Sequence, residues 1–199
     1  MRVELGEPLT RHGLSPVLGA PVASAGSRGV RAIAAGVGTR PWIGRQDGTV
    51  DRGDRVLRGT DGRGPVTVMV PFARGVAVGW ASGTTAVVEE SPRAAVLREH
   101  SWQSGLTGAV LALATSSDGG CLVALDDRGH VAAQPGVSRS GLRHGERLSA
   151  AAIDGDRRRA LVAPIGSSVA LVDLTNGDCT RTDLREPVLC AAALPQDQG

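Results

Sequence analysis

Acidic residues occur in pairs at predicted turns, and these pairs are the groups in the chain best suited to chemistry. Two neighbouring carboxylates can act as general acid and general base, or can bind a calcium ion through their oxygens. The pairs are Asp51 and Asp54, Glu89 and Glu90, Asp126 and Asp127, and Asp154 and Asp156. Each pair also fits a solvated turn, and this simpler interpretation is the one we expect to hold.

The histidines do not have the spacing of a metal site. His12, His100, His130 and His144 form no His-x-x-x-His or His-x-His pattern, and none has a cysteine close by. We therefore expect no metal centre.

The cysteines are an odd number and lie far apart. Cys121, Cys179 and Cys190 form no Cys-x-x-Cys motif, so neither a disulfide framework nor a structural zinc site is expected. Each lies in or beside an apolar run. This placement predicts buried free thiols in a reducing compartment.

Motifs of nucleophilic catalysis and of phosphate binding are also missing. The sequence closest to a nucleophile elbow is 23–26, where Val22 stands in place of the first glycine. The run 36–41 begins like a dinucleotide fingerprint, but Pro41 replaces the third glycine and the run joins two predicted strands. We predict no catalytic, cofactor-binding or metal-ligating residue, no cofactor, and no enzymatic activity.

The charge of the chain bears on the kind of partner that it could bind. All 22 basic residues are arginine, against 20 acidic residues, and the net charge is +2. Phosphate recognition would use arginine, but the codon bias of a GC-rich genome explains this composition more simply. We expect the run 157–159 to be a charged loop tip, and contact with an anion or a partner is the less favoured interpretation. We expect no nucleic-acid partner.

No stretch predicts secretion or membrane association. The N-terminal residues 1–13 carry charges at positions 2, 4 and 7 and have no apolar core, unlike a secretory signal. The longest uncharged run, 101–117, contains glycine, serine and threonine residues within its first eight positions and falls short of a membrane span. These features predict a cytoplasmic protein with no membrane partner.

The organisation of the chain is clearest in the stretch 148–184. It contains apolar runs at 148–153, 160–165 and 168–174, separated by polar turns, and then a weaker extended run. The pattern predicts a four-stranded antiparallel sheet. Because the second and third runs are apolar at nearly every position, we expect neighbouring sheets to cover both of their faces.

The rest of the chain repeats this unit. The first strands of successive units are predicted to begin at Val30, Val66, Val110, Leu148 and Val188, which are 36 to 44 residues apart. A period near 40 with four strands is typical of a β-propeller blade, so we predict an all-β fold. The predicted parts are an outer strand and Gly/Ala/Pro-rich loop at 1–29, units at 30–65, 66–108, 109–147 and 148–187, and a partial strand at 188–194.

The units resemble WD40 repeats over nearly all of the chain, from position 3 to position 194. The run 169–174 stands where that family has a strand ending in Trp-Asp, and 47–50 and 127–131 resemble its Asp-Gly-x-Val turns. His144, four residues before Leu148, stands where the family's Gly-His precedes a first strand. The opening 5–12 resembles the outer strand and Gly-His segment of bacterial WD40 arrays.

The chain also departs from the family pattern. No unit contains Trp-Asp, and Val172 stands in place of the tryptophan in the best-matching unit. Gly-His is replaced by Arg-His at His12 and His144 and by Glu-His at His100. The family's buried hydrogen-bond network is therefore incomplete here, and we expect these histidines to be structural and not ligands.

The resemblance implies a non-enzymatic scaffold that binds a protein partner. Rings of this family have more blades than the four units found here. The resemblance therefore also implies either a half-propeller that assembles with a second copy or with missing blades, or a piece of a longer protein. Two alternatives stay open: a hydrolase, small-ligand or metal-binding propeller with a carboxylate-lined channel, and a sensor module of a larger bacterial signalling or defence protein.

The tryptophans are expected to pack between blades. They are Trp42, Trp80 and Trp102. Trp102, flanked by serine and glutamine near a predicted long loop, is expected to be the most exposed of the three and a possible anchor for a partner.

Overall fold

All regular structure in the described residues is β-structure. The computed structural model describes residues 29–35, 40–57, 62–91, 96–102, 104–116, 118–134, 139–140, 147–154, 159–176 and 178–188. Within these ranges sixteen strands form four antiparallel sheets, each built from four consecutive strands. This arrangement confirms the predicted all-β fold with four-stranded blades. No helix in the same ranges is long and apolar enough to cross a membrane.

The four sheets are named blades 1 to 4 in chain order. Blade 1 contains β1 (Val30–Ala34), β2 (Trp42–Arg45), β3 (Val50–Arg52) and β4 (Arg55–Leu57). Blade 2 contains β5 (Val66–Phe72), β6 (Gly75–Trp80), β7 (Thr85–Glu90) and β8 (Leu97–Trp102). Blade 3 contains β9 (Val110–Thr115), β10 (Leu122–Asp126), β11 (His130–Gln134) and β12 (Arg139–Ser140). Blade 4 contains β13 (Leu148–Asp154), β14 (Arg159–Pro164), β15 (Ser168–Asp173) and β16 (Cys179–Asp183).

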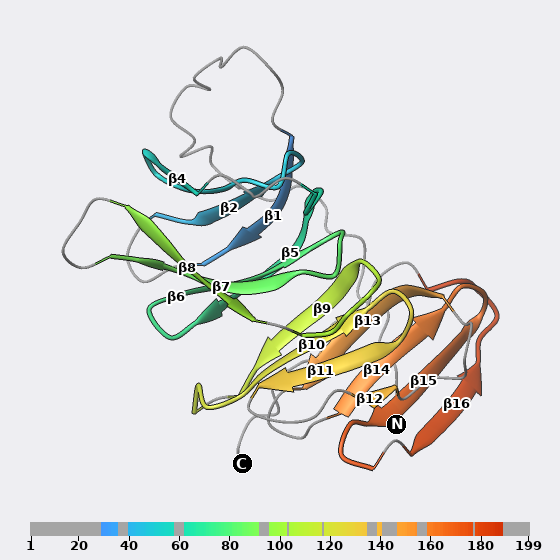
Figure 1. The fold of residues 1–199 in the computed structure, drawn as a ribbon. Coiled ribbons are helices and arrows are strands. Elements are labelled where there is room, and N and C mark those ends of the chain that lie inside the picture. Colours follow the sequence, from blue (N-terminus) through green and yellow to red (C-terminus); the bar gives the residue numbers. More distant parts are fainter. Residues whose placement is uncertain are drawn as a thin grey trace, which may run out of the picture.

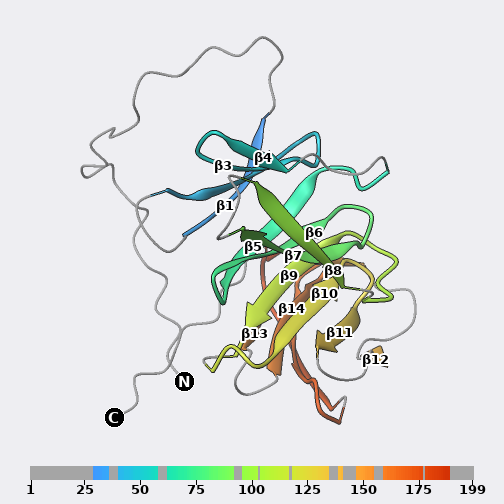
Figure 2. The same cartoon turned by 60° about the vertical axis from the view of Figure 1, so that its left-hand side comes forward.

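The blades follow one another in an arc. The first strands β1, β5, β9 and β13 contact each other in succession, and Figures 1 and 2 show the sheets stacked side by side from blade 1 to blade 4. These strands begin at the four positions predicted from the repeat, Val30, Val66, Val110 and Leu148. The turn after each second strand also repeats. In blades 1 to 3 this turn contains a glycine with φ near +80°, a conformation that other residues adopt only with strain.

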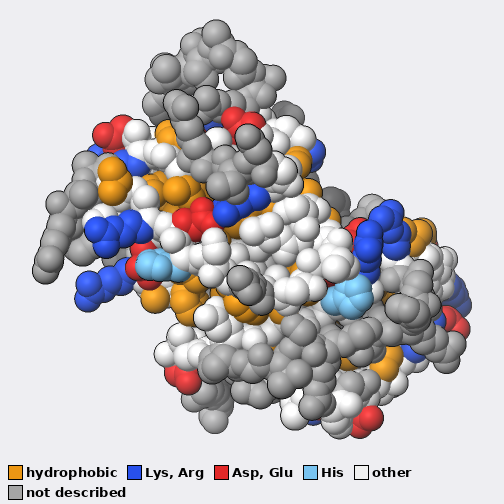
Figure 3. Space-filling model, viewed as in Figure 1, with side chains coloured by type: hydrophobic (Ala, Val, Ile, Leu, Met, Phe, Trp, Pro, Cys, Tyr) orange, Lys and Arg blue, Asp and Glu red, His pale blue; other side chains and the backbone are white. Residues whose placement is uncertain are grey.

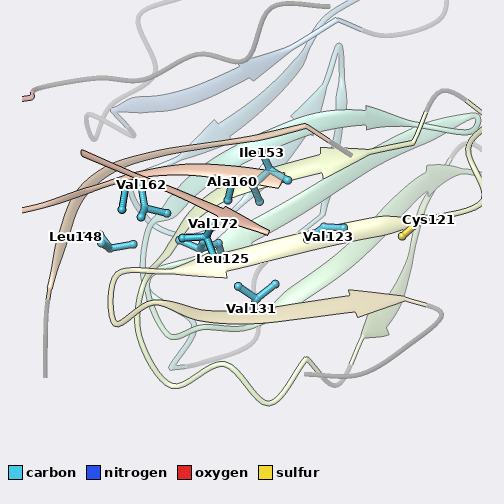
Figure 4. Close-up of a cluster of buried hydrophobic side chains, with 11 residues drawn as sticks. Cys121, Val123, Leu125, Val131, Leu148, Ile153, Ala160, Val162 and Val172 are labelled. Atoms are coloured by element: carbon cyan, nitrogen blue, oxygen red, sulfur yellow. The ribbon is translucent and has the colours of Figure 1, made fainter. Parts of the chain in front are cut away.

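Three hydrophobic cores lie between successive blades, as expected for sheets that bury their faces against one another. Figure 4 shows the core between blades 3 and 4, where Leu125 and Val131 of blade 3 point toward Val162 and Val172 of blade 4. In blade 2, β6 is buried at every position, and in blade 3 the same is true of β10. Stacking therefore explains why these second strands are apolar on both faces.

Close packing between blades depends on a glycine in the second strand. Gly44 of β2 and Gly79 of β6 occupy the same place, one residue before the strand ends. The first residue of the next blade packs there, Val66 against Gly44 and Val110 against Gly79. A Cβ added at Gly79 would lie 2.6 Å from the Cβ of Val110. Only glycine leaves room for this contact.

The prediction that both faces of 160–165 and 168–174 are covered is wrong for one face. Val162 and Val172 are buried against blade 3, whereas Leu171 is 45% exposed and Ile165 is 70% exposed. The reason is that no sheet of the described residues packs on this side of blade 4. Blade 1 has an equivalent open face at the other end of the arc, where Ile33 is 65% exposed.

The prediction of buried thiols is confirmed for Cys121 and wrong for Cys179. Cys179 is exposed because β16 is the outer strand of blade 4, and every side chain of that strand is exposed. Several predictions fall outside the described residues. They concern the segment 1–28 with His12, the positions His144, Asp156 and Cys190, the charged pair 157–158, and the partial strand beyond Val188.

Candidate functional site

The paired carboxylates do not converge on one site. Their ion-pair partners are different arginines: Asp51 with Arg45 at 2.7 Å, Asp54 with Arg40 at 3.4 Å, Glu90 with Arg52 and Arg55 at 3.4 and 3.1 Å, and Asp127 with Arg147 at 3.8 Å. Within the described residues, no group of three or more histidine, cysteine, aspartate or glutamate side chains could hold a metal ion. These carboxylates act mainly as partners of arginine.

Arginine and tryptophan form the seam between blades 1 and 2. Trp42 and Trp80 are fully buried there, as predicted, and each is covered by a guanidinium group. Arg52 lies 4.7 Å from the ring centroid of Trp42, and Arg63 lies 4.8 Å from that of Trp80. Trp80 Nε1 also donates to the carbonyl of Gly48 in blade 1 at 2.9 Å. This seam holds the two blades together.

A bidentate ion pair extends the seam. Arg63 donates to both carboxylate oxygens of Glu99, at 2.8 and 2.5 Å. The hydrogen bond from Arg63 holds the pKa of Glu99 below its ordinary value, although burial acts in the opposite direction. Ser101 donates its hydroxyl to the same carboxylate at 2.8 Å.

The buried carboxylate of Asp126 organises the start of blade 3. It is 0% exposed and accepts five hydrogen bonds. The donors are the backbone amides of Thr107, Gly108, Arg128 and His130, at 2.8 to 3.2 Å, and His130 Nδ1 at 3.0 Å. Burial is the largest influence on the pKa of Asp126 and raises it, but the hydrogen bonds together outweigh burial and lower the pKa. The carboxylate thus ties the turn after β10 to the segment that enters β9.

A cleft between blades 2 and 3 is the candidate binding site. Its volume is about 400 Å³. Apolar side chains form the floor, Phe72 and Val87 from blade 2 and Leu122 from blade 3. The rim is polar and contains Glu89, His100, Ser101, Gly120 and Gln134. In Figure 3, histidine, acidic and basic side chains lie together over β7 and β8, with hydrophobic side chains beside them.

Strand register explains how the cleft is built. In blade 2, β7 and β8 pair Val87 with His100 and Glu89 with Arg98, so these side chains share the face that looks toward blade 3. In blade 3, β10 and β11 pair Leu122 with Gln134, which places the carboxamide above the apolar floor. Phe72 ends β5 next to this face. The walls therefore belong to two rigid sheets.

Serine, histidine and glutamate in one cleft are residue types of an acyl-transfer triad, but the geometry is not that of a triad. The Ser101 hydroxyl donates to Glu99 and not to His100. His100 Nε2 lies 4.0 Å from Glu89 Oε2, beyond hydrogen-bond distance. A nucleophile must be within hydrogen-bond reach of its base. In this structure Ser101, His100 and Glu89 are therefore not aligned for acyl transfer.

The structure brings some of the sequence-predicted residues together and leaves the others apart. Glu89 and His100 come together in the cleft, whereas the other described carboxylates of the predicted pairs lie elsewhere. Trp102 is half-buried against the core between blades 2 and 3 and is the most exposed tryptophan, as expected. The partnership of Asp126 with His130 was not predicted, although an aspartate at the end of an apolar strand was its signal.

No protein-family model matches the sequence, and no curated protein does. Solved structures do match the fold. A chain of a crystal structure of the mitotic checkpoint complex matches with a TM-score of 0.57 and 19% identity over 76% of this chain and 49% of that chain. Raptor from Chaetomium thermophilum matches with a TM-score of 0.65 and 16% identity over 82% of this chain and 17% of that chain. The chain thus spans about half, or less, of the length of these proteins. Its four four-stranded antiparallel sheets have the fold of WD40 β-propeller blades.

Proposed function

We propose that the protein is a non-enzymatic WD40-like scaffold that binds a protein partner in the cleft between blades 2 and 3. The observation that carries this proposal is a cleft of about 400 Å³ with an apolar floor and a polar rim, held between two sheets. Apolar surface supplies binding free energy, and convergent polar groups supply orientation. WD40 propellers commonly bind proteins, which supports the same function.

Binding fits the polar groups of the cleft better than catalysis does. Ser101 is engaged with Glu99, and the side chain of His100 is 64% exposed. A carboxylate-lined channel finds no support in the described residues, because the paired carboxylates do not converge. Most of them bind separate arginines, and Asp126 binds His130 and backbone amides. We therefore propose binding, and not hydrolysis, as the function of this cleft.

A peptide selection tests this function. Random peptides displayed on phage are selected on the immobilised protein, and the enriched peptides are measured against two variants. Gln134→Trp fills the cleft from the last residue of β11. Asp183→Trp is the matched control, since Asp183 is the exposed last residue of β16. We expect Gln134→Trp to raise the Kd about tenfold or more and Asp183→Trp to leave it unchanged. Equal binding to both variants, or no enrichment, would refute the proposal.

The open ends of the arc support a second contact, with further blades. Blade 1 exposes Ile33 and Val56, and blade 4 exposes Leu161 and Leu171, on faces that interior blades bury. We propose that additional blades, from a second copy or from additional chain, cover these faces. The same stacking that joins blades 1 to 4 would then continue.

A further inference from the structure

We infer that the cleft between blades 2 and 3 binds an arginine or lysine side chain of the partner, with the carboxylate of Glu89 as its counter-ion. The inference rests on the proposed function and names the group that the cleft recognises.

Glu89 differs from the other carboxylates of blade 2. Glu90 binds Arg52 and Arg55 of blade 1, and Glu99 binds Arg63. In the described part of the chain, no guanidinium nitrogen lies within 4.0 Å of the Glu89 carboxylate, and its ring neighbour is the imidazole of His100 at 4.0 Å. In a protein with 22 arginines, the carboxylate that faces the cleft is thus the one in this blade without a guanidinium partner.

Two arginines near Glu89 do not take this role. Arg98 is its cross-strand neighbour on β8, and Arg74 precedes Gly75, which pairs with Glu89 on the other side. Both are exposed, and neither is joined to Glu89 by an ion pair. They lie beside the cleft and are not among its lining residues. Glu89 is therefore available to a cation that enters the cleft.

The floor suits the aliphatic stem of a basic side chain. Val87, Leu122 and Phe72 line the cleft, and Phe72 is the most accessible of the three, so the stem would pack on this apolar side of the cleft. Long basic side chains bind in this way, with the stem on apolar surface and the charged head at a polar edge. The carboxamide of Gln134, on the opposite wall, offers a further acceptor for the head.

Other occupants fit less well. A wholly apolar side chain would cover Glu89 without pairing it, and burying an unpaired charge is costly. An acidic side chain would meet a like charge, which is repulsive at short distance. A basic side chain satisfies both the floor and the carboxylate.

The test is an NMR titration of the ¹⁵N-labelled protein with Nα-acetyl-arginine amide, and separately with Nα-acetyl-citrulline amide, its neutral isostere. We expect saturable shifts of the amides of His100, Leu122 and Gln134 with the arginine probe, and binding about tenfold weaker with citrulline. Glu89→Gln should remove this difference. Glu186→Gln, which removes a carboxylate in the exposed segment after β16, should leave it intact.

The outcomes separate this inference from the proposed function. Equal binding of the two probes, or no shifts at the cleft, would overturn the inference. The peptide selection described above would still report on the cleft by itself. Peptides that depend on Gln134 but contain no arginine or lysine at the anchor would leave the scaffold function standing and refute the basic anchor.

Discussion

Replacement of Asp126 should lower the free energy of unfolding strongly, because this small side chain accepts five hydrogen bonds. Replacing it by alanine leaves the backbone amides of Thr107, Gly108, Arg128 and His130 without this acceptor, and the hydrogen bond from Gly108 is buried. We expect Asp126→Ala to lower the free energy of unfolding by about 3 kcal/mol, as for other broken buried networks. Urea unfolding at neutral pH, followed by circular dichroism, measures this change. The control is Asp118→Ala, at an exposed turn, which should have little effect. Equal effects of the two variants would show that the buried network contributes nothing special.

Stability should fall at acidic pH. The pKa values of Asp126 and Glu99 are lowered from ordinary values of 3.8 and 4.5. A carboxylate with a lowered pKa in the folded state adds stability that is fully present above its ordinary pKa. That stability is lost as the pH falls through the folded value. We expect the unfolding free energy to decline below about pH 4.5, and the decline to be shallower in Asp126→Asn. Unfolding curves from pH 7 to pH 2.5 test this, and parallel pH profiles would contradict it.

The two seam tryptophans offer a matched comparison. Both are fully buried under an arginine, but only Trp80 donates a hydrogen bond, to Gly48. Trp42 Nε1 is buried without a partner in the described residues. We expect Trp80→Phe to destabilise the protein by about 1 kcal/mol more than Trp42→Phe, because one change breaks a hydrogen bond and the other removes an unsatisfied donor. Urea unfolding compares them directly. A larger loss for Trp42→Phe would mean that its indole nitrogen does have a partner.

At the scale of the element, a glycine in the second strand of blades 1 and 2 sets how closely the next blade approaches. Gly79→Ala would place a Cβ 2.6 Å from Val110, inside a packed core. We expect a loss of about 1 to 3 kcal/mol from overpacking. Gly29→Ala is the control, since its added Cβ meets only the Cβ of Gln46 at 3.8 Å, an ordinary contact. The measurement is again the free energy of unfolding, and an unchanged value for Gly79→Ala would show that the blades can move apart without cost.

Much of the strand pattern was predictable from the sequence. Val30, Val66, Val110 and Leu148 begin first strands because each opens an apolar run that follows a polar or glycine-containing turn. Because successive side chains of a strand point to opposite faces of the sheet, the sequence also predicts that Glu89 and Val87, two positions apart, share a face.

The site was less predictable, because it depends on which faces meet. Pairing of Val87 with His100, and the approach of Gln134 from blade 3, follow from register and stacking and not from local pattern. The network of Asp126 was missed for the same reason, since it joins residues 18 and 19 positions apart. The exposure of Cys179 depends on β16 being the outer strand of its sheet, which the apolar pattern of the chain does not reveal.

At the scale of the whole molecule, the exposed faces at the two ends of the arc predict association. If a second copy covers them, light scattering coupled to gel filtration should give twice the mass of one chain, because two arcs can close one ring with two equivalent contacts. Leu171→Glu should restore the mass of one chain. Val96→Glu changes an exposed valine just before β8 of the interior blade 2, and should leave the dimer intact. A monodisperse single-chain species for the unaltered protein would exclude the second copy and leave additional blades as the cover.

Within each blade, a backbone hydrogen bond joins the end of the second strand to the start of the first strand. The backbone amide after the second strand donates to the carbonyl just before the first strand of the same blade. The four pairs are Gln46 with Gly29, Ala81 with Pro65, Asp127 with Ala109, and Ile165 with Arg147, at 2.8 to 2.9 Å. No described sheet borrows a strand from a distant part of the chain. Contacts of low sequence separation favour fast folding, and a row of nearest-neighbour units can nucleate at any one of them. Duplication or deletion of about 40 residues would therefore lengthen or shorten the arc by one blade without changing how its neighbours fold.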